Sequence, residues 1–198
     1  MATSRANKNI SQFKSKLIGG GARPNLFEVE LTTLPPNVVS NWDADIFQFM
    51  CKAASLPPQN IANLDVPFRG RIFKVAGDRT IDNWTITIIN DEDFRIREAF
   101  ETWTEGIASL DTNMGATNPN NYMSNAFVTQ LGRGDKKQST GPGGEDRAKL
   151  YQYEFRDIWP VNVSNIDLSY DTSDTIEEFT VEFAVQTIVR RPDNQIVS

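Results

Sequence analysis

An alternation of apolar and polar residues recurs along most of this chain. From Trp84 to Ile88, in WTITI, every second side chain is apolar, which is the period of a half-buried β-strand. Alternation of this kind, or an apolar run bounded by proline, predicts strands over residues 26–31, 46–55, 63–75, 84–88, 126–131, 150–157, 165–171 and 176–189. Gly77 is expected to supply the positive φ of a tight turn, and residues 171–174 are expected to form a hairpin turn.

One segment has a helical period instead. Its apolar stripe consists of Ile96, Phe100, Trp103, Ile107 and Leu110. Charged residues occupy the opposite side, so we expect a surface helix over about residues 92–110 that packs on a sheet. Asn90 and Asp91 precede it, and their side-chain oxygens are expected to accept hydrogen bonds from its first N–H groups.

Glycine-rich and polar segments suggest how the chain is organised. Residues 1–22 are expected to form an arm with a short helix over 11–18, residues 23–189 a single β domain, and residues 190–198 a polar tail. Mobile loops are expected at about 111–124 and 132–147. Antiparallel strands with one helix and no βαβ rhythm predict a mainly β fold, a β-sandwich or barrel-like domain with one flanking α-helix.

Composition excludes several kinds of chemistry. The 198 residues include no histidine and one cysteine, Cys51, which removes Ser-His-Asp and Cys-His catalysis, histidine-ligated metals and intrachain disulfides. Cys51 is expected to be a small buried hydrophobe. The segment 141–144, GPGG, lacks the Gly-Lys pair of a P-loop. We therefore predict no catalytic residue, no metal and no cofactor.

The N-terminal segment carries no signal for export or membrane insertion. It lacks the apolar core and cleavage site of a signal peptide, and no run approaches the roughly 18 apolar residues of a membrane span. The expectation is a soluble protein made in a reducing cytoplasm.

A basic cluster is the first candidate functional surface. It comprises Arg69, Arg71, Lys74 and Arg79, with Asp78 beside them. The aromatic residues between them would suit a nucleic-acid patch, but the chain has a net charge of −6, which disfavours phosphate binding. A charged interface between subunits is the favoured interpretation.

Carboxylates gather in the C-terminal third as the second candidate surface. Asp167, Asp171, Glu178 and Glu182 represent this set. Most of these residues fall on the polar faces of predicted strands or in a turn, so a solvated face is the simplest interpretation. The functional alternative is a surface that repels phosphate.

Ordered blocks of sequence resemble the tail tube proteins of contractile-tail bacteriophages. The blocks are ARPNLFEVE (22–30), CKAASLP (51–57), the segment Val66–Asp93, and IWPVNV (158–163), in which a Trp-Pro turn is expected. Each block alone is weak, but their order and spacing over roughly residues 22–188 are specific.

The resemblance implies a subunit whose strands join those of its neighbours into one continuous barrel around a lumen. Six copies would form a ring, and rings would stack into the inner tube that carries the genome into the host. Implied partners are the chain itself, a tail sheath protein, a baseplate initiator, a tail terminator, and genomic DNA that passes without specific binding. The protein would be assembled in the host cytoplasm and reside in the virion. Part of the acidic set would line the lumen.

Other functions are kept open. The chain could be the tube of a phage-derived injection machine or a tube-initiating baseplate protein. A monomeric ligand-binding β-sandwich would use Trp42 or Tyr122 as a stacking platform. A carboxylate enzyme needs two acidic groups that converge in a cleft, and the sequence shows no such convergence.

Overall fold

The computed structural model describes residues 9–17, 21–35, 42–135, 147–171 and 173–192. Its helices are α1 (Ile10–Lys16), α2 (Ala44–Met50) and α3 (Arg95–Ile107), with a 3₁₀ turn, η2, at Pro119–Asn121. Its strands are β1 (Phe27–Thr33), β2 (Cys51–Ala54), β3 (Asn60–Phe68), β4 (Arg71–Thr80), β5 (Trp84–Ile89), β6 (Ser124–Asp135), β7 (Arg147–Val163) and β8 (Glu178–Pro192).

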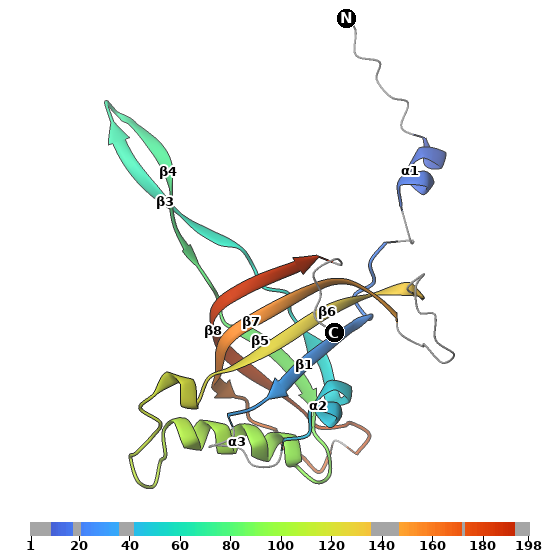
Figure 1. The fold of residues 1–198 in the computed structure, drawn as a ribbon, viewed down its shortest axis with the longest axis vertical. Coiled ribbons are helices and arrows are strands. Elements are labelled where there is room, and N and C mark those ends of the chain that lie inside the picture. Colours follow the sequence, from blue (N-terminus) through green and yellow to red (C-terminus); the bar gives the residue numbers. More distant parts are fainter. Residues whose placement is uncertain (1–8, 18–20, 36–41, 136–146, 172, 193–198) are drawn as a thin grey trace, which may run out of the picture.

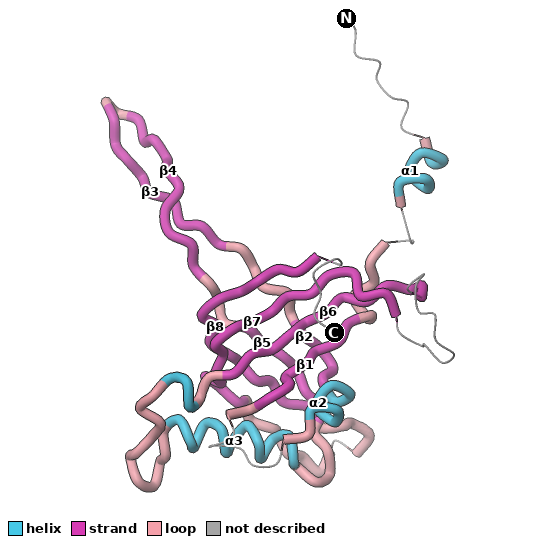
Figure 2. The backbone as a smooth tube through the Cα atoms, viewed as in Figure 1, coloured by secondary structure: helices cyan, strands magenta, loops and turns pink. Residues whose placement is uncertain are grey.

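Six strands form one sheet in the order β1-β6-β7-β8-β5-β2, and every neighbouring pair is antiparallel. The sheet curls into a nearly closed barrel, with β1 and β2 as its two edge strands (Figures 1 and 2). β3 and β4 form a separate two-stranded ribbon that projects away from this body. The predicted mainly β, barrel-like fold with a flanking helix is confirmed.

The core fills the inside of the barrel. β5 buries Trp84, Ile86 and Ile88 and turns its threonines outward, as its alternation predicts. α3 lies across one end of the barrel and buries Ile96, Phe100 and Trp103 (Figure 1). The ring of Phe100 lies 5.8 Å from that of Phe183 on β8. Leu110, predicted to belong to the helix stripe, lies beyond the helix end and is 90% exposed.

A helix stands where the first half of a strand over residues 46–55 was expected. The carboxylate of Asp43 accepts hydrogen bonds from the N–H groups of Asp45 and Ile46, at 3.1 and 3.2 Å, and so caps α2. Phe47 is fully buried, whereas Phe49 is 83% exposed, which is a helical and not a strand pattern. Only the second half of the predicted strand is confirmed, as β2.

The reversal between β3 and β4 lies at Arg69 and Gly70, inside the single strand predicted over residues 63–75. Both residues have positive φ, 44° and 81°. Gly77, predicted to be the turn, lies within β4 instead. Its role is close packing, because a Cβ there would lie 3.1 Å from the carbonyl oxygen of Ala62 across the ribbon.

α3 begins later than predicted and without the expected cap. Its N-cap residue is Phe94, in the left-handed region with φ of 54°, and no side chain caps it. Asn90 instead binds Glu177, through the backbone at 2.9 Å and through Nδ2 at 3.0 Å. The Oδ1 atoms of Asn90 and Asp91 are buried without a hydrogen-bond partner. The prediction that these two residues cap α3 is wrong.

β7 runs through the expected Trp-Pro turn. Trp159 pairs with Ala184 and Pro160 with Phe183, so both belong to the strand. Asp157 has a left-handed backbone conformation, which interrupts the apolar-polar alternation of β7. The strand therefore continues through a β-bulge against β6. Residues 164–171 and 173–177 form a loop, so the predicted strand over 165–171 is wrong. The hairpin turn expected at 171–174 includes Thr172, which lies outside the described residues.

Several elements begin or end a few residues away from their predicted bounds. α1 matches the short helix expected in the arm. Arg190 and Arg191 belong to β8 and not to a tail. Most of the predicted loop at 132–147 lies outside the described residues.

Candidate assembly surfaces

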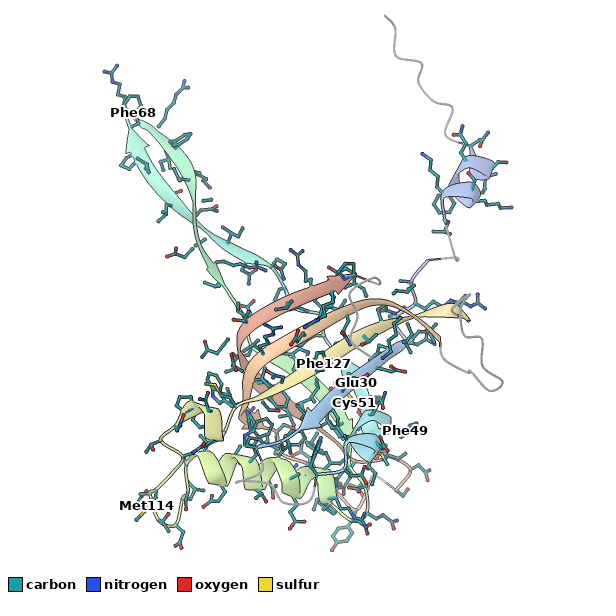
Figure 3. All side chains as sticks on the ribbon, in the orientation of Figure 1. Glu30, Phe49, Cys51, Phe68, Met114 and Phe127 are labelled. Carbon is teal, nitrogen blue, oxygen red and sulfur yellow. The ribbon has the colours of Figure 1, made fainter. Side chains whose placement is uncertain are left out.

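The β3–β4 ribbon presents one apolar face to solvent. Directly opposed residues share a face of a ribbon, and the register pairs Leu64 with Val75 and Val66 with Phe73, while Phe68 follows at the tip. We call these five residues the apolar face of the ribbon; each is 40–67% exposed. Figure 3 shows their part of the chain standing clear of the body, with Phe68 at its end.

Such a ribbon cannot be explained by the stability of an isolated chain. A lone two-stranded hairpin is marginally stable in water, and a contiguous apolar patch marks a binding surface. Both outer edges of the ribbon also leave backbone groups free for pairing. These features are typical of an element that becomes ordered against another subunit.

The predicted basic cluster is divided between the turn and the two faces of this ribbon. Arg69 lies in the turn, with its guanidinium 5.3 Å from the ring centroid of Phe68. Arg71 is opposed to Phe68 and borders the apolar face, whereas Arg79 is opposed to Ile61, beyond a register shift, and lies on the opposite face. That face also carries Lys74, which is opposed to Asp65, and Asp78 lies at the register shift.

The predicted acidic set is divided between a strand and a loop. Glu178 and Glu182 lie on the outward face of β8. Glu178 forms an ion pair with Lys52 at 2.5 Å, and Glu182 accepts a hydrogen bond from Asn83 Nδ2 at 2.7 Å.

The other two carboxylates, Asp167 and Asp171, lie in the β7–β8 loop, residues 164–171 and 173–177. The Asp167 carboxylate accepts a hydrogen bond from Asn165 at 2.8 Å. Asp167 and Glu178 both line a groove of about 680 Å³ that this loop forms.

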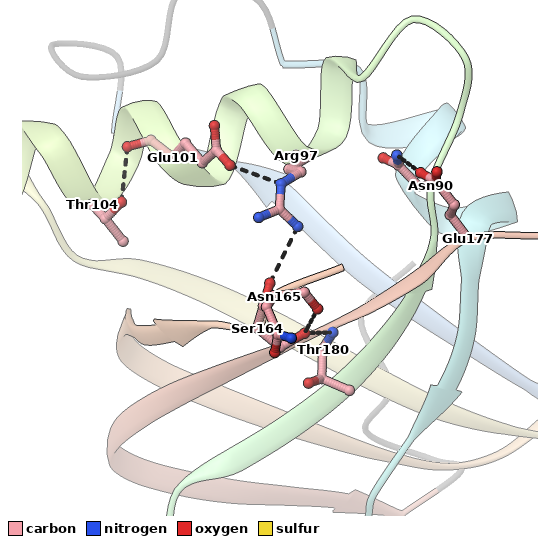
Figure 4. A network of polar contacts seen from close by, with 8 residues as sticks. All are labelled: Asn90, Arg97, Glu101, Thr104, Ser164, Asn165, Glu177 and Thr180. Carbon is pink, nitrogen blue, oxygen red and sulfur yellow. Dashed lines mark hydrogen bonds and ion pairs between the residues drawn. The ribbon is translucent and has the colours of Figure 1, made fainter. Parts of the chain in front are cut away.

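Both ends of the β7–β8 loop are anchored to the body (Figure 4). At its start, the carbonyl oxygen of Ser164 accepts a hydrogen bond from Arg97 of α3 at 3.2 Å. The N–H of Thr180 donates to the hydroxyl of Ser164 at 2.9 Å. At its end, Glu177 is held by Asn90. The groove is therefore attached to the sheet on one side and to α3 on the other.

A buried ion cluster is the main feature that the sequence did not reveal. Glu154 is 6% exposed and accepts hydrogen bonds from Arg156, at 2.8 and 3.0 Å, and from Arg191, at 3.0 and 2.6 Å. The hydrogen bonds from Arg156 and then those from Arg191 hold the pKa of the Glu154 carboxyl below its usual value. Residues two apart on one strand share a face, so Arg156 could have been predicted, but Arg191 depends on the β7–β8 register.

The aromatic residues proposed as ligand platforms have structural partners. The indole N–H of Trp42 donates to the Leu31 carbonyl at 2.6 Å, and its ring packs 5.1 Å from that of Phe47. Tyr122 accepts the indole N–H of Trp103 on its carbonyl and packs edge-on against Trp159. Neither ring is a free platform, which weakens the ligand-binding alternative.

Within the described ranges, no group of three or more Asp, Glu or Cys side chains is placed to hold a metal ion. Burial raises the pKa of the Cys51 thiol to about 12, which keeps it in the unreactive thiol form. No helix in the described part of the chain is long and apolar enough to cross a membrane.

Comparison with known proteins places these surfaces in context. The family model described as "Phage tail tube protein" matches residues 22–190. Tail tube protein gp19 of Enterobacteria phage T4 is 35% identical over 167 residues, 84% of this chain and 90% of that protein. The tail tube protein of Serratia phage KSP90 is 22% identical and covers 87% of this chain and 92% of its own length.

Solved structures share the fold at low sequence identity. The anti-feeding prophage baseplate, 6-fold symmetrised, contains a chain with a TM-score of 0.60 and 12% identity, covering 87% of this chain and 97% of that one. The PVC sheath-tube complex of an extracellular contractile injection system, in its extended state, gives a TM-score of 0.56 and 11% identity over 93% of this chain and 99% of the other.

Proposed function

Because this chain belongs to the phage tail tube protein family, we propose that it is the structural subunit of the inner tube of a contractile tail. Six copies form a ring, and rings stack into a hollow tube through which the genome leaves the virion. The similarity to the T4 tail tube protein covers 90% of that protein, so it extends over most of a tube subunit.

The apolar face of the ribbon is the observation that carries this proposal. Its five side chains are 40–67% exposed in the single chain. Burial of such a face against another copy contributes on the order of 5 kcal/mol before the ordering cost of association. A heterologous contact of this kind, repeated between copies, builds an open-ended filament.

Charged residues around the ribbon add specificity to the same contact. Arg69, Arg71, Lys74 and Arg79 place positive charge on an extension of a chain with a net charge of −6. The body of a neighbouring subunit is therefore attractive to the ribbon, and Asp78 adds an acceptor to the interface. Complementary charge sets register and speeds encounter more than it adds affinity.

The edge strands β1 and β2 supply the second type of contact. Each has backbone groups along one side that the six-stranded sheet leaves unpaired. Pairing of these edges between subunits would continue the sheet around a ring and close one barrel about a lumen.

Glu178 and Glu182 are candidates for the lumen wall, because they lie on the outward face of β8. Negative charge there would keep the DNA backbone from sticking during passage. A tube carrying Glu182→Lys should assemble and then retain duplex DNA at low salt. If that tube passes and binds DNA as the wild-type tube does, Glu182 does not line the lumen.

The tube requires partners at its sides and ends. Chains of the same fold occur in a sheath-tube complex, a baseplate, and a sheath/tube terminator of contractile injection systems. We propose a sheath protein, a baseplate initiator and a terminator as partners of this chain, with assembly in the host cytoplasm and no catalytic turnover. The virion tail tube is its final location.

A tube of a phage-derived injection machine is the second candidate, since the PVC and anti-feeding prophage chains share the fold. Sequence identity to those chains is 11–12%, against 35% to the T4 tail tube protein, which favours the phage tail.

Negative-stain electron microscopy of the purified full chain, with gel filtration beside it, tests the proposal. Rings or hollow tubes of one diameter are the expected result. A chain that stays monomeric at high concentration, and that also fails to extend a purified tube initiator, would overturn it.

A further inference from the structure

Helix α1 carries an apolar stripe that contacts little of its own subunit. Ile10, Phe13 and Leu17 fall on one side at helical spacing and are 73%, 63% and 44% exposed. Lys14 and Lys16 flank this stripe on its two sides. Asn9 caps the helix, with its side chain accepting a hydrogen bond from Gln12 N–H at 2.9 Å. The segment is thus a short, basic, amphipathic helix whose apolar stripe is largely exposed among the described residues.

The groove of the β7–β8 loop has the complementary composition. Leu168, Tyr170 and Ile176 line it, and they are 81%, 107% and 71% exposed in the single chain. Asp167, Glu177 and Glu178 also line it. It is an open surface groove with a volume of about 680 Å³. A groove lined by exposed apolar and acidic residues suits an apolar helix face with lysines on both flanks.

Sheet topology places the helix and the groove at opposite ends of the subunit. β1 and β5 begin at the same end, because they are separated by an odd number of intervening antiparallel strands. α1 precedes β1 and the ribbon precedes β5, so both leave from this end (Figure 1). The β7–β8 loop follows the far end of β7 and lies beside the N-terminus of α3.

We propose that α1 of one subunit docks in the β7–β8 groove of a second copy in the adjacent ring. This rests on the proposed tube, in which one end of each ring meets the opposite end of the next. The ten residue-to-residue steps from Leu17 to Phe27 span at most about 36 Å, enough for the helix to reach past the end of its own barrel. The anchored ends of the loop keep the groove formed before the helix arrives.

Cysteine cross-linking tests the proposal, because the native Cys51 is buried and its thiol unreactive. The chain with Lys14→Cys and Asp167→Cys is oxidised after assembly and run on a non-reducing gel. We expect a ladder of covalent products that extends past six copies, since contacts between rings do not close. Ser15→Cys with Asp167→Cys is the matched control, because Ser15 lies on the opposite side of α1, and it should cross-link at least about tenfold less.

The alternatives give different gels. A ladder that stops at six copies places the contact within a ring, and a fast-migrating monomer places the helix on its own subunit; either overturns the proposal. Tubes without cross-links overturn this docking and leave the tube function intact. If the wild-type chain forms neither rings nor tubes, with or without an initiator, both proposals fall.

Charge exchange gives a second measurement. Lys14→Glu with Lys16→Glu should raise the concentration needed for tube growth about tenfold or more, a change that corresponds to about 1.4 kcal/mol. Adding Asp167→Lys should restore part of the loss. No effect of the double substitution, or no rescue, would count against the docking.

Discussion

Glu154 and Arg191, which lie 37 positions apart, are joined across β7 and β8 by two hydrogen bonds of 3.0 and 2.6 Å to one carboxylate oxygen. Arg156 binds the same carboxylate from its own strand. The cluster ties the beginning of β7 to the end of β8. Its two arginines keep part of their surface in solvent, whereas the Glu154 side chain is almost fully buried.

Glu154→Gln should lower the free energy of unfolding by about 1–3 kcal/mol, because two guanidinium groups lose a charged, buried acceptor. Chemical denaturation of the unassembled chain measures this. Glu178→Gln is the control, since its pair with Lys52 is exposed and should contribute less than about 1 kcal/mol. Equal costs for the two substitutions would mean that burial of Glu154 does not matter.

The same cluster predicts a dependence of stability on pH. The pKa of the Glu154 carboxyl is lowered in the folded chain from its ordinary value of 4.5 by the two arginines. Its contribution is therefore complete above that value and is lost as the pH falls below it towards the folded pKa. The difference in unfolding free energy between wild type and Glu154→Gln should shrink in that range. A difference that stays constant down to about pH 3 would assign the effect to shape and not to charge.

A negative charge introduced on one face of the ribbon should have a different effect on assembly from the same charge on the other face. Phe73→Asp should prevent tube growth, because it places a carboxylate in the apolar face, yet it should change the stability of the single chain by less than about 0.5 kcal/mol. Ile72→Asp is the matched control: the two side chains are 67% and 64% exposed, but Ile72 lies on the opposite face. Electron microscopy and gel filtration compare them. Equal loss of assembly would show that both faces are covered in the tube.

Cys51 should resist thiol reagents in the native chain. Burial raises the pKa of its thiol from 9.0 to about 12, which reduces the thiolate fraction near neutral pH roughly a thousandfold. A chromogenic disulfide reagent should label one thiol per chain in denaturant and react far more slowly without it. Rapid labelling of the native chain would indicate that β2 opens frequently.

The sequence predicted best those elements whose burial is decided within one segment. Trp84, Ile86 and Ile88 alternate along β5 and are buried as expected, and Phe100 and Trp103 define the inner side of α3. Their environment follows from a regular period and a sheet or helix that covers one face.

The secondary-structure predictions failed where the structure of a segment depends on whether another segment, distant in the sequence, packs against it. Leu168 and Tyr170 alternate like a strand, but β7 and β8 pair directly with each other and leave no place for a third strand there. Asp43 and Phe47 form a helix whose burial depends on Trp42 and Phe100.

The candidate surfaces were also predicted correctly within one segment and incorrectly, or not at all, where they depend on the register between strands. The basic residues were grouped correctly on one segment, but their division between two faces needed the turn at Gly70. Arg191 could not be linked to Glu154 without the register of β8.

A ribbon that buries nothing on its own body has a kinetic consequence. Two chains that meet in solution must both order their ribbons, and this entropic cost opposes the first contact. In the proposed tube, a finished ring would present six ordered ribbons at once, so the next subunit would lose conformational entropy only in its own ribbon. Growth from an initiating ring would therefore be faster than the formation of new tubes from free subunits, which would give the initiator more control over tube number than the concentration of this chain.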